Sequence, residues 1–208
     1  MAFTYFFRDM QTLEMIRDHA LPMLRSRMYI NIWDAGCAMG PEPYSLAMII
    51  RENMGKMLFR NVKIHATDID GSNLFEKIIA DGIYPREQVA RIPAHIFDKY
   101  FSPAEEPDHF RISEEIRGCV NYKKHDLLGL CPVRKDFSLI MCKNVLLHFQ
   151  SEDRTSVIRM FYDALADDGY FVTEQTQKMP PGFEGMFEQV VPNAQLFRKI
   201  TPEQEAGE

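Results

Sequence analysis

The sequence predicts an α/β fold in which a mostly parallel sheet carries helices on both faces. Two observations predict it. Short apolar runs typical of strands alternate along the chain with longer segments that have apolar residues at helical spacing. The first two of these runs also end in a glycine-containing turn or an acidic residue. Strands that alternate with helices form right-handed βαβ units, and such units build a three-layer fold.

The first elements follow from apolar spacing and from proline. Residues Phe6–Leu24 have helical spacing, which predicts an opening helix. A short apolar run over Tyr29–Ala35 leads into a glycine-containing turn, so we expect a strand and then a loop. Pro41 and Pro43 lie in the first turn of a helix expected over Glu42–Asn53, where a missing N–H costs nothing.

The alternation continues and then breaks in the middle of the chain. A second strand is expected over Val62–Thr67, ending at Asp68, and Gly82 should stop the helix that follows over Ser72–Asp81. Beyond it, the expected pieces are a short helix at 94–101, a loop at 102–118, and short strands around 109–112 and 119–124. We treat Tyr84–Lys124 as a possible inserted subdomain within one domain, residues 1–200.

The last third returns to the alternating pattern. A strongly apolar strand is expected first, then an amphipathic helix ended by the turn signal Asp167-Asp168-Gly169, and finally two strands. These elements are the strand Phe137–Cys142, the helix Asp153–Ala166, the strands Tyr170–Glu174 and Ala194–Ile200, and a polar tail, residues 201–208.

Composition narrows the class of protein. With 46% hydrophobic and 26% charged residues, the chain fits a soluble globular domain. It has no apolar run of about 18 residues, so we expect no membrane insertion, and Met1–Asp9 lacks the pattern of a signal peptide, so we expect a cytoplasmic protein. The net charge of −6 argues against a nucleic-acid partner. The four cysteines have no metal-ligand spacing, so we expect reduced thiols and no metal.

Three strand ends carry candidate chemistry. The loop in IWDAGCAMGPEPYS (32–45) has small residues, Gly36 among them, that suit close approach to a ligand and suit a tight turn equally well. Asp68, at the tip of the second strand, is placed to bind two ribose hydroxyls or to act as a cap, and Asp70 is a candidate helix cap. The strand end MCKNVLLHF (141–149) places Lys143, Asn144 and His148 after a buried run.

Taken together, the motifs resemble one family. TYFFRD (4–9), WDAGCAMGPEPYSLAM (33–48), ATDID (66–70), GIY (82–84), DLL (126–128), CKNVLLHF (142–149) and the ending QLFRK (195–199) resemble, in order, the motifs of the CheR-type chemoreceptor glutamate methyltransferases. The resemblance covers nearly the whole chain. It implies the three-layer Rossmann-like fold of class I methyltransferases that use S-adenosylmethionine (SAM), with an antiparallel C-terminal strand and S-adenosylhomocysteine as product.

The resemblance also implies roles for particular residues. Arg8 and His148 match positions near the substrate and the transferred methyl group, and Arg8 also contacts the cofactor. The implied cofactor-binding residues are Thr4, Arg8, Gly36, Glu42, Asp68, Asp126, Leu127, Cys142 and Lys143. Among them Glu42 would meet the methionine amino group, Asp68 the ribose, and Asp126 with Leu127 the adenine.

The chain departs from the family pattern in several places. Lys143 stands where the family usually has arginine, His148 where it has tyrosine, and Pro41 where it has glutamate. Ala2 stands where an asparagine is common. The T-x-F-F-R motif starts at Thr4, so we expect the helical domain that usually precedes it to be absent or to belong to another chain. A neutral imidazole accepts a proton more readily than tyrosine, so His148 leaves open an acceptor other than a glutamate, such as a hydroxyl, amine or thiol.

We therefore expect a SAM-dependent methyltransferase that modifies a protein glutamate carboxylate, as in chemotaxis signalling, or a related acceptor. Its expected partner is a receptor or signalling protein, and the oligomeric state is open. Two alternatives stay open: a non-catalytic SAM-binding signalling module, and a small-molecule O- or N-methyltransferase.

Overall fold

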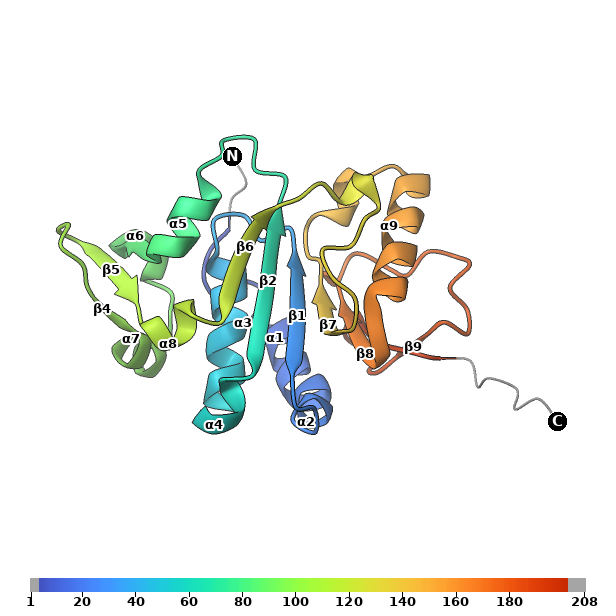
Figure 1. Cartoon of the computed structure of the whole chain (residues 1–208), viewed down its shortest axis with the longest axis horizontal. Coiled ribbons are helices and arrows are strands. Elements are labelled where there is room, and N and C mark those ends of the chain that lie inside the picture. The colour runs from blue at the N-terminus through green and yellow to red at the C-terminus, as the bar shows by residue number, and fades with distance from the viewer. Residues whose placement is uncertain (1–3, 202–208) are drawn as a thin grey trace.

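The structure is a computed structural model that describes residues 4–201. Its main sheet has seven strands in the order β6-β2-β1-β7-β8-β10-β9. The strands from β6 to β8 run parallel, whereas β10 is antiparallel to β8 and β9. The predicted mostly parallel sheet with an antiparallel C-terminal strand is confirmed, and helices cover both of its faces (Figure 1).

The bounds of the elements are as follows. The strands are β1 Ile30–Ala35, β2 Val62–Asp68, β3 Ile83–Pro85, β4 Phe101–Pro103, β5 His109–Ile112, β6 Val120–Lys124, β7 Phe137–Met141, β8 Leu165–Val172, β9 Phe187–Gln189 and β10 Leu196–Lys199. The α-helices are α1 Met10–Met15, α2 Leu21–Leu24, α3 Pro41–Glu52, α4 Lys56–Phe59, α5 Phe75–Asp81, α6 Arg86–Val89, α7 Ala94–Tyr100, α8 Glu114–Arg117 and α9 Ser151–Ala164. A π-helix, Ile16–Ala20, joins α1 to α2, and 3₁₀ turns cover Leu127–Gly129 and Leu146–His148.

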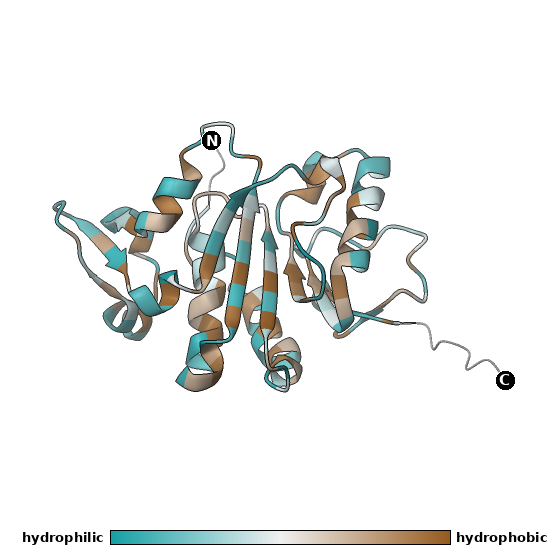
Figure 2. Ribbon diagram, in the orientation of Figure 1, coloured by the Kyte–Doolittle hydropathy of each residue, from teal (hydrophilic) through white to brown (hydrophobic). Residues whose placement is uncertain are grey.

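The sheet separates two hydrophobic clusters because successive strand residues point to opposite faces. Ile32 of β1 packs into the cluster that α1, α2 and α3 share, whereas its neighbour Trp33 packs into the cluster under α9. Figure 2 shows this alternation as bands of hydrophobic and polar residues along the central strands. The central strands are therefore held rigidly from both sides, and their carboxyl ends form a fixed edge.

A second sheet, in the order β3-β5-β4, lies beside the main one with α6 and α7 (Figure 1). It is formed within residues 83–112. The strand that we expected around Cys119–Lys124 pairs instead with β2 in the main sheet, so it lies outside this unit. Phe6 links the N-terminal segment to the small sheet, with ring centroids 5.0 Å from Tyr84 and 5.6 Å from Phe101.

Some expected boundaries differ from the observed ones. The opening helix begins at Met10 rather than at Phe6, because Phe7 and Asp9 have left-handed backbone conformations (φ 58° and 54°). Near the C-terminus, β8 starts at Leu165, directly after α9, so the expected turn at 167–169 lies inside a strand. There Asp168 has a φ of 55° and the pairing with β7 shifts register, as at a bulge.

Candidate active site

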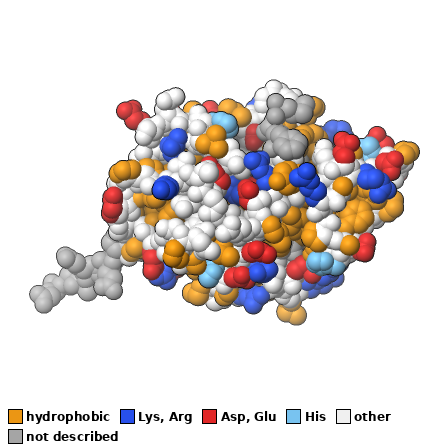
Figure 3. Space-filling model, turned by 180° about the vertical axis from the view of Figure 1, so that it is seen from behind, with side chains coloured by type: hydrophobic (Ala, Val, Ile, Leu, Met, Phe, Trp, Pro, Cys, Tyr) orange, Lys and Arg blue, Asp and Glu red, His pale blue; other side chains and the backbone are white. Residues whose placement is uncertain are grey.

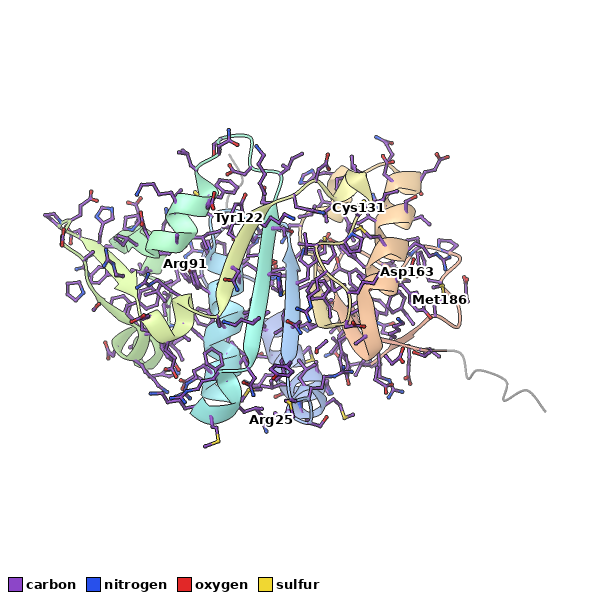
Figure 4. The ribbon with its side chains drawn as sticks, viewed as in Figure 1. Arg25, Arg91, Tyr122, Cys131, Asp163 and Met186 are labelled. Carbon is purple, nitrogen blue, oxygen red and sulfur yellow. The ribbon has the colours of Figure 1, made fainter. Side chains whose placement is uncertain are left out.

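A cavity of about 590 Å³ opens at the carboxyl ends of β1, β2, β6 and β7. Its wall is completed by the N-terminal segment at Thr4 and Arg8. Figure 4 shows this end of the sheet at the top, near Tyr122 of β6, with Arg25 at the opposite end. Open α/β sheets bind ligands at this edge, because the loops that follow neighbouring parallel strands converge there.

The residues that the sequence predicted for the site meet at this cavity, with one exception. Those that line it are Thr4, Arg8, Gly36, Glu42, Asp68, Asp126, Leu127, Lys143 and His148. Cys142 does not line the cavity and is fully buried in the cluster under α9. Adjacent residues of an extended chain point to opposite sides, so Lys143 faces the cavity and Cys142 faces the core. The side chain of Cys142 thus lies behind the cavity wall, and its contact with a cofactor stays a prediction.

Asp68 ties two of the converging loops together. Its Oδ2 accepts a hydrogen bond from the backbone N–H of Ala38 (2.9 Å), and its Oδ1 accepts one from the N–H of Asp70 (3.1 Å). Each carboxylate oxygen keeps a further lone pair. Asp68 therefore holds two loops together and presents its carboxylate at the cavity wall, and its contact with a ribose stays a prediction.

Asp70 holds the turn that leads into α5. Its Oδ1 accepts hydrogen bonds from the N–H and hydroxyl of Ser72 (3.1 and 2.7 Å), and its Oδ2 accepts one from the N–H of Phe75 (3.0 Å). Since Phe75 is the first residue of α5, Asp70 satisfies a donor that the helix start would otherwise leave unpaired. Asp70 is not the N-cap residue considered from the sequence, because Leu74 occupies that position, but its side chain accepts a hydrogen bond from the first N–H of the helix.

Apolar side chains and a capping acid form the end of the cavity beside β2 and β6. Leu127 is buried, whereas Ile69 and Leu128 line the cavity with exposed side chains. Asp126 Oδ1 accepts a hydrogen bond from the N–H of Leu128 (2.9 Å) and so caps the 3₁₀ turn. These residues give this end of the cavity apolar surface and one carboxylate.

Lys143 is the centre of an ionic cluster at the other end of the cavity. Its Nζ lies 3.1 Å from Oε2 of Glu42 and 3.3 Å from Oδ2 of Asp9, and its side chain is 0% exposed. Burial alone lowers the pKa of this amine, but the carboxylates of Glu42 and Asp9 outweigh burial, so its pKa is raised. Lys143 is therefore a charged group whose partners are acids of the same chain.

The N-terminal segment is anchored so that it reaches this cluster. The N–H of Phe7 donates to the hydroxyl of Ser45 (2.8 Å) in α3, and the left-handed turns at Phe7 and Asp9 redirect the chain. The backbone carbonyl of Arg8 then accepts a hydrogen bond from Lys143 Nζ (3.4 Å). Apart from its place in TYFFRD, no feature of the sequence indicated this role of Asp9.

Arg8 presents a guanidinium at the mouth of the cavity. Its Nη2 donates to Oδ1 of Asn144 (3.3 Å), and the side chain is partly buried. Asn144 has a left-handed backbone (φ 57°), and its N–H donates to Oε2 of Glu174 (2.9 Å). Glu174 is itself buried, so the Arg8 contact rests on a fixed loop.

His148 ends the 3₁₀ turn after β7 and is exposed at the cavity wall. The loop that carries it is packed closely against Gly36, whose φ is 106°. A Cβ at Gly36 would lie 2.1 Å from Cγ2 of Val145. Glycine is required here by the backbone conformation and by the packing of the loop, in addition to any ligand.

Asp34 is a site residue whose role sequence reasoning missed. It lies at the carboxyl end of β1 and is 0% exposed, and burial followed by the charge of Glu42 raises its pKa well above the usual range. Within residues 4–201, neither of its oxygens has a hydrogen-bond partner, and Oε1 of Glu42 is likewise without one. The signal available in the sequence was an acid inside an apolar strand, IWDA.

Comparison with known proteins identifies the family. Residues 2–195 match the profile of the family described as CheR methyltransferase, SAM binding domain.

The chain belongs to this family.

Several curated CheR-family proteins are similar along most of the chain. The chemotaxis protein methyltransferase of Borreliella burgdorferi is 34% identical over 178 residues, which make up 81% of this chain and 62% of that protein. The chemotaxis protein methyltransferase of Listeria monocytogenes is 30% identical over 184 residues, 87% of this chain and 67% of that protein. The chain thus spans about two thirds of the length of the curated relatives it matches.

Solved structures support the fold alone. The rRNA methyltransferase AviRa from Streptomyces viridochromogenes aligns over 95% of this chain and 86% of its own chain, with a TM-score of 0.57 and 12% sequence identity. The CheR family and this likeness confirm the class I SAM-methyltransferase fold and SAM as the family's cofactor. Within the described residues 4–201, no helix has the length and apolar character needed to cross a bilayer.

Proposed function

We propose that the chain is the catalytic domain of a SAM-dependent methyltransferase that esterifies a glutamate carboxylate of a protein partner. The single observation that carries the proposal is the convergence of the family's motif residues on one cavity. Thr4 and Arg8 come from the N-terminal segment, and they face Glu42, Asp68 and Lys143 from three different strand ends. The chemotaxis names of the relatives point to a receptor or signalling protein as the partner.

The end of the cavity beside β2 and β6 fits the adenosine part of the cofactor. Asp68 keeps free lone pairs toward the cavity after its two backbone hydrogen bonds, which suits two ribose hydroxyls. Ile69, Leu127 and Leu128 supply apolar surface for a planar base. Asp126 would accept a hydrogen bond from an exocyclic amine.

The opposite end fits the amino acid part of the cofactor. Oε1 of Glu42 has no hydrogen-bond partner among the described residues, although the side chain lines the cavity. A buried acceptor without a donor is costly unless a ligand supplies one. An ammonium group is such a donor, so Glu42 would hold it while Lys143 keeps the other carboxylate oxygen in place.

The bound cofactor would supply an electrophilic methyl group for an in-line displacement. The chain's task is then to orient and desolvate an acceptor carboxylate, which is already anionic at neutral pH. Arg8 suits this task because a guanidinium pairs with a carboxylate through two parallel hydrogen bonds. Lys143 is committed to Glu42 and Asp9, so it sets the charge of the cofactor end rather than pairing with the acceptor.

His148 supports a wider choice of acceptor. It lines the cavity with an exposed side chain, so a neutral imidazole there could take a proton from a hydroxyl, amine or thiol. The ester proposal and this alternative differ in the bond that is formed. Carboxyl methyl esters release methanol in mild alkali, whereas N-methyl, S-methyl and ether products do not.

The test uses SAM labelled in the methyl group, incubated with the protein and with cytoplasmic extract that contains signalling proteins. We expect labelled protein and alkali-released methanol. Label that resists alkali would refute the ester and favour the alternative acceptors.

A non-catalytic SAM-binding module is the second candidate, because the substituted Lys143 is fully engaged with acids of its own chain. Tight binding of SAM without acceptor-dependent release of S-adenosylhomocysteine would favour this module. Label recovered in small molecules instead of protein would favour a small-molecule methyltransferase.

We place the activity in the cytoplasm, where the signalling proteins of the extract reside. In Figure 3 acidic and basic side chains are interspersed on the visible face, an arrangement that offers no broad basic surface there to a nucleic acid.

A further inference from the structure

Asp34 and Glu42 form a buried pair of acids beneath the cofactor end of the cavity. Three of their four oxygens, both of Asp34 and Oε1 of Glu42, have no hydrogen-bond partner among the described residues. The fourth, Oε2 of Glu42, lies 3.1 Å from Lys143 Nζ. Glu42 lines the cavity, whereas Asp34 is fully buried behind it, at the end of β1.

The surroundings of Asp34 do not balance two negative charges. The charged and titratable groups that act on it are Glu42 from α3, Asp68 from the end of β2, Cys37 from the loop after β1, and Cys142 and Lys143 from the segment after β7. Of these only Lys143 is positive, and it is already shared between Glu42 and Asp9. A second buried carboxylate without a donor would be very costly.

We propose that Asp34 and Glu42 share one proton, and that a cationic amine bound at Glu42 expels this proton to the solvent. The proton sits on Asp34 as a carboxylic acid that donates to Glu42 Oε1. When the amine binds, the O–H bond of Asp34 breaks, its electron pair stays on the carboxylate, and the proton passes to the buffer. Asp34 is thus a positioning residue, because it acts on the ligand through Glu42.

The exchange follows from counting donors and charges. The shared proton offers Glu42 Oε1 a single donor and no added charge, whereas an ammonium group at the cavity wall offers it a donor and a full positive charge. Once Glu42 accepts hydrogen bonds from the amine, it holds the shared proton less strongly, and the added positive charge stabilises an ionised Asp34.

This inference rests on the proposed function, since it takes the amine of the cofactor as the cation. The experiment is isothermal titration calorimetry with S-adenosylhomocysteine in phosphate and in Tris buffer at about pH 6.5, where the ligand's amine is protonated. The two buffers differ in ionisation enthalpy, so the difference in apparent binding enthalpy counts the protons released. We expect each bound ligand to release about one proton or slightly less.

Two controls isolate the pair. The ligand 5′-methylthioadenosine keeps the adenosine and thioether but lacks the amine, so its binding should release no proton. Asp34→Asn should bind S-adenosylhomocysteine without proton release, whereas Asp108→Asn, which alters an exposed acid that pairs with Arg86 outside the cavity, should release protons as the wild type does.

The outcomes distinguish failure of the proposed function from failure of the shared-proton inference. Failure of the wild type to bind S-adenosylhomocysteine at all would refute the proposed function. Binding with the same enthalpy in both buffers would overturn the shared proton, and so would equal release from Asp34→Asn. A folding defect in Asp34→Asn would be seen in its circular dichroism, and the wild-type comparison with 5′-methylthioadenosine then decides the inference alone.

Discussion

Lys143 Nζ lies between two carboxylates, 3.1 Å from Glu42 and 3.3 Å from Asp9, and thereby joins α3, the segment after β7 and the N-terminal segment. Each of these parts of the chain contributes to the wall of the cavity. The position is one where the family usually carries arginine. The ionic cluster connects the stability of the domain with the shape of its cofactor end, and this connection can be tested.

Replacing Lys143 with methionine should destabilise the protein by about 3–5 kcal/mol, because removal of one partner leaves buried acids uncompensated. Denaturant unfolding measures the change. The exposed Lys77, which pairs with Asp81, provides a matched control, and Lys77→Met should change stability little. A small effect of Lys143→Met would show that the cluster is more solvated than the structure indicates.

Asp34→Asn should change how stability depends on pH. Burial and Glu42 raise the pKa of Asp34 in the folded state, so the folded protein holds a proton that the unfolded chain has lost. Stability is therefore fully present below the unfolded pKa of about 4 and falls as pH rises toward the folded pKa, by up to about 1.4 kcal/mol per pH unit. The asparagine variant should lack this slope and be more stable near neutral pH. Thermal unfolding at several pH values would reveal parallel profiles if Asp34 is ionised in the native state.

Asp68→Ala should abolish detectable cofactor binding. The substitution removes the acceptor proposed for the ribose and also the two backbone contacts that hold Ala38 and Asp70. Hydrogen bonds to a charged group contribute about 1.5–3 kcal/mol each. Losing the two proposed bonds to the ribose hydroxyls therefore corresponds to at least about a 100-fold loss of affinity. Calorimetry with S-adenosylhomocysteine measures it. Unchanged affinity would refute the ribose assignment.

Gly36→Ala should lower stability by about 2 kcal/mol or more, because the new Cβ would lie 2.1 Å from Val145 and the residue would keep an unfavourable positive φ. Val145→Ala removes the clashing methyl groups, so the double variant should recover part of the loss. Thermal unfolding of the four proteins measures this coupling. If Gly36→Ala lowers stability equally in the wild type and in the Val145→Ala variant, the whole destabilisation comes from the backbone conformation and not from the contact with Val145.

His148→Tyr should restore the family's usual residue at the cavity wall and leave cofactor binding intact. If His148 serves a hydroxyl, amine or thiol acceptor, the variant should lose most transfer to that acceptor and keep transfer to glutamate. A panel of acceptors assayed with both proteins measures the shift. Equal methylation of receptor-type glutamates by both proteins, with no other acceptor used, would remove the alternative.

The sequence was sufficient for the sheet and for most of the cavity wall. Apolar runs identified the central strands, and Asp68 and Lys143 meet at one cavity because parallel strands end at one edge. Arg8, on the N-terminal segment, was expected there only from the resemblance. The sequence did not show which side chains point into the core and which point into the cavity. Cys142 and Lys143 are neighbours, yet one enters the core and the other the cavity, and only the pairing of β7 with β8 shows which.

Other features depend on contacts between distant segments. Two of these contacts join residues that are far apart in the chain. Asp9 pairs with Lys143, and Val145 packs closely against Gly36. The small sheet was visible only as short strands, and the pairing of Cys119–Lys124 with β2 could not be derived from local pattern. Ala2, where the family commonly has asparagine, lies outside the described residues.

The central claim is that this cavity binds SAM and directs its methyl group to a protein carboxylate. The most direct measurement is transfer of labelled methyl from SAM to cytoplasmic protein, followed by mild alkali. We predict alkali-released methanol from the wild type and a large loss of it in Arg8→Ala, with binding of S-adenosylhomocysteine measured in parallel. Tight binding of the ligand without any labelled acceptor would contradict the account.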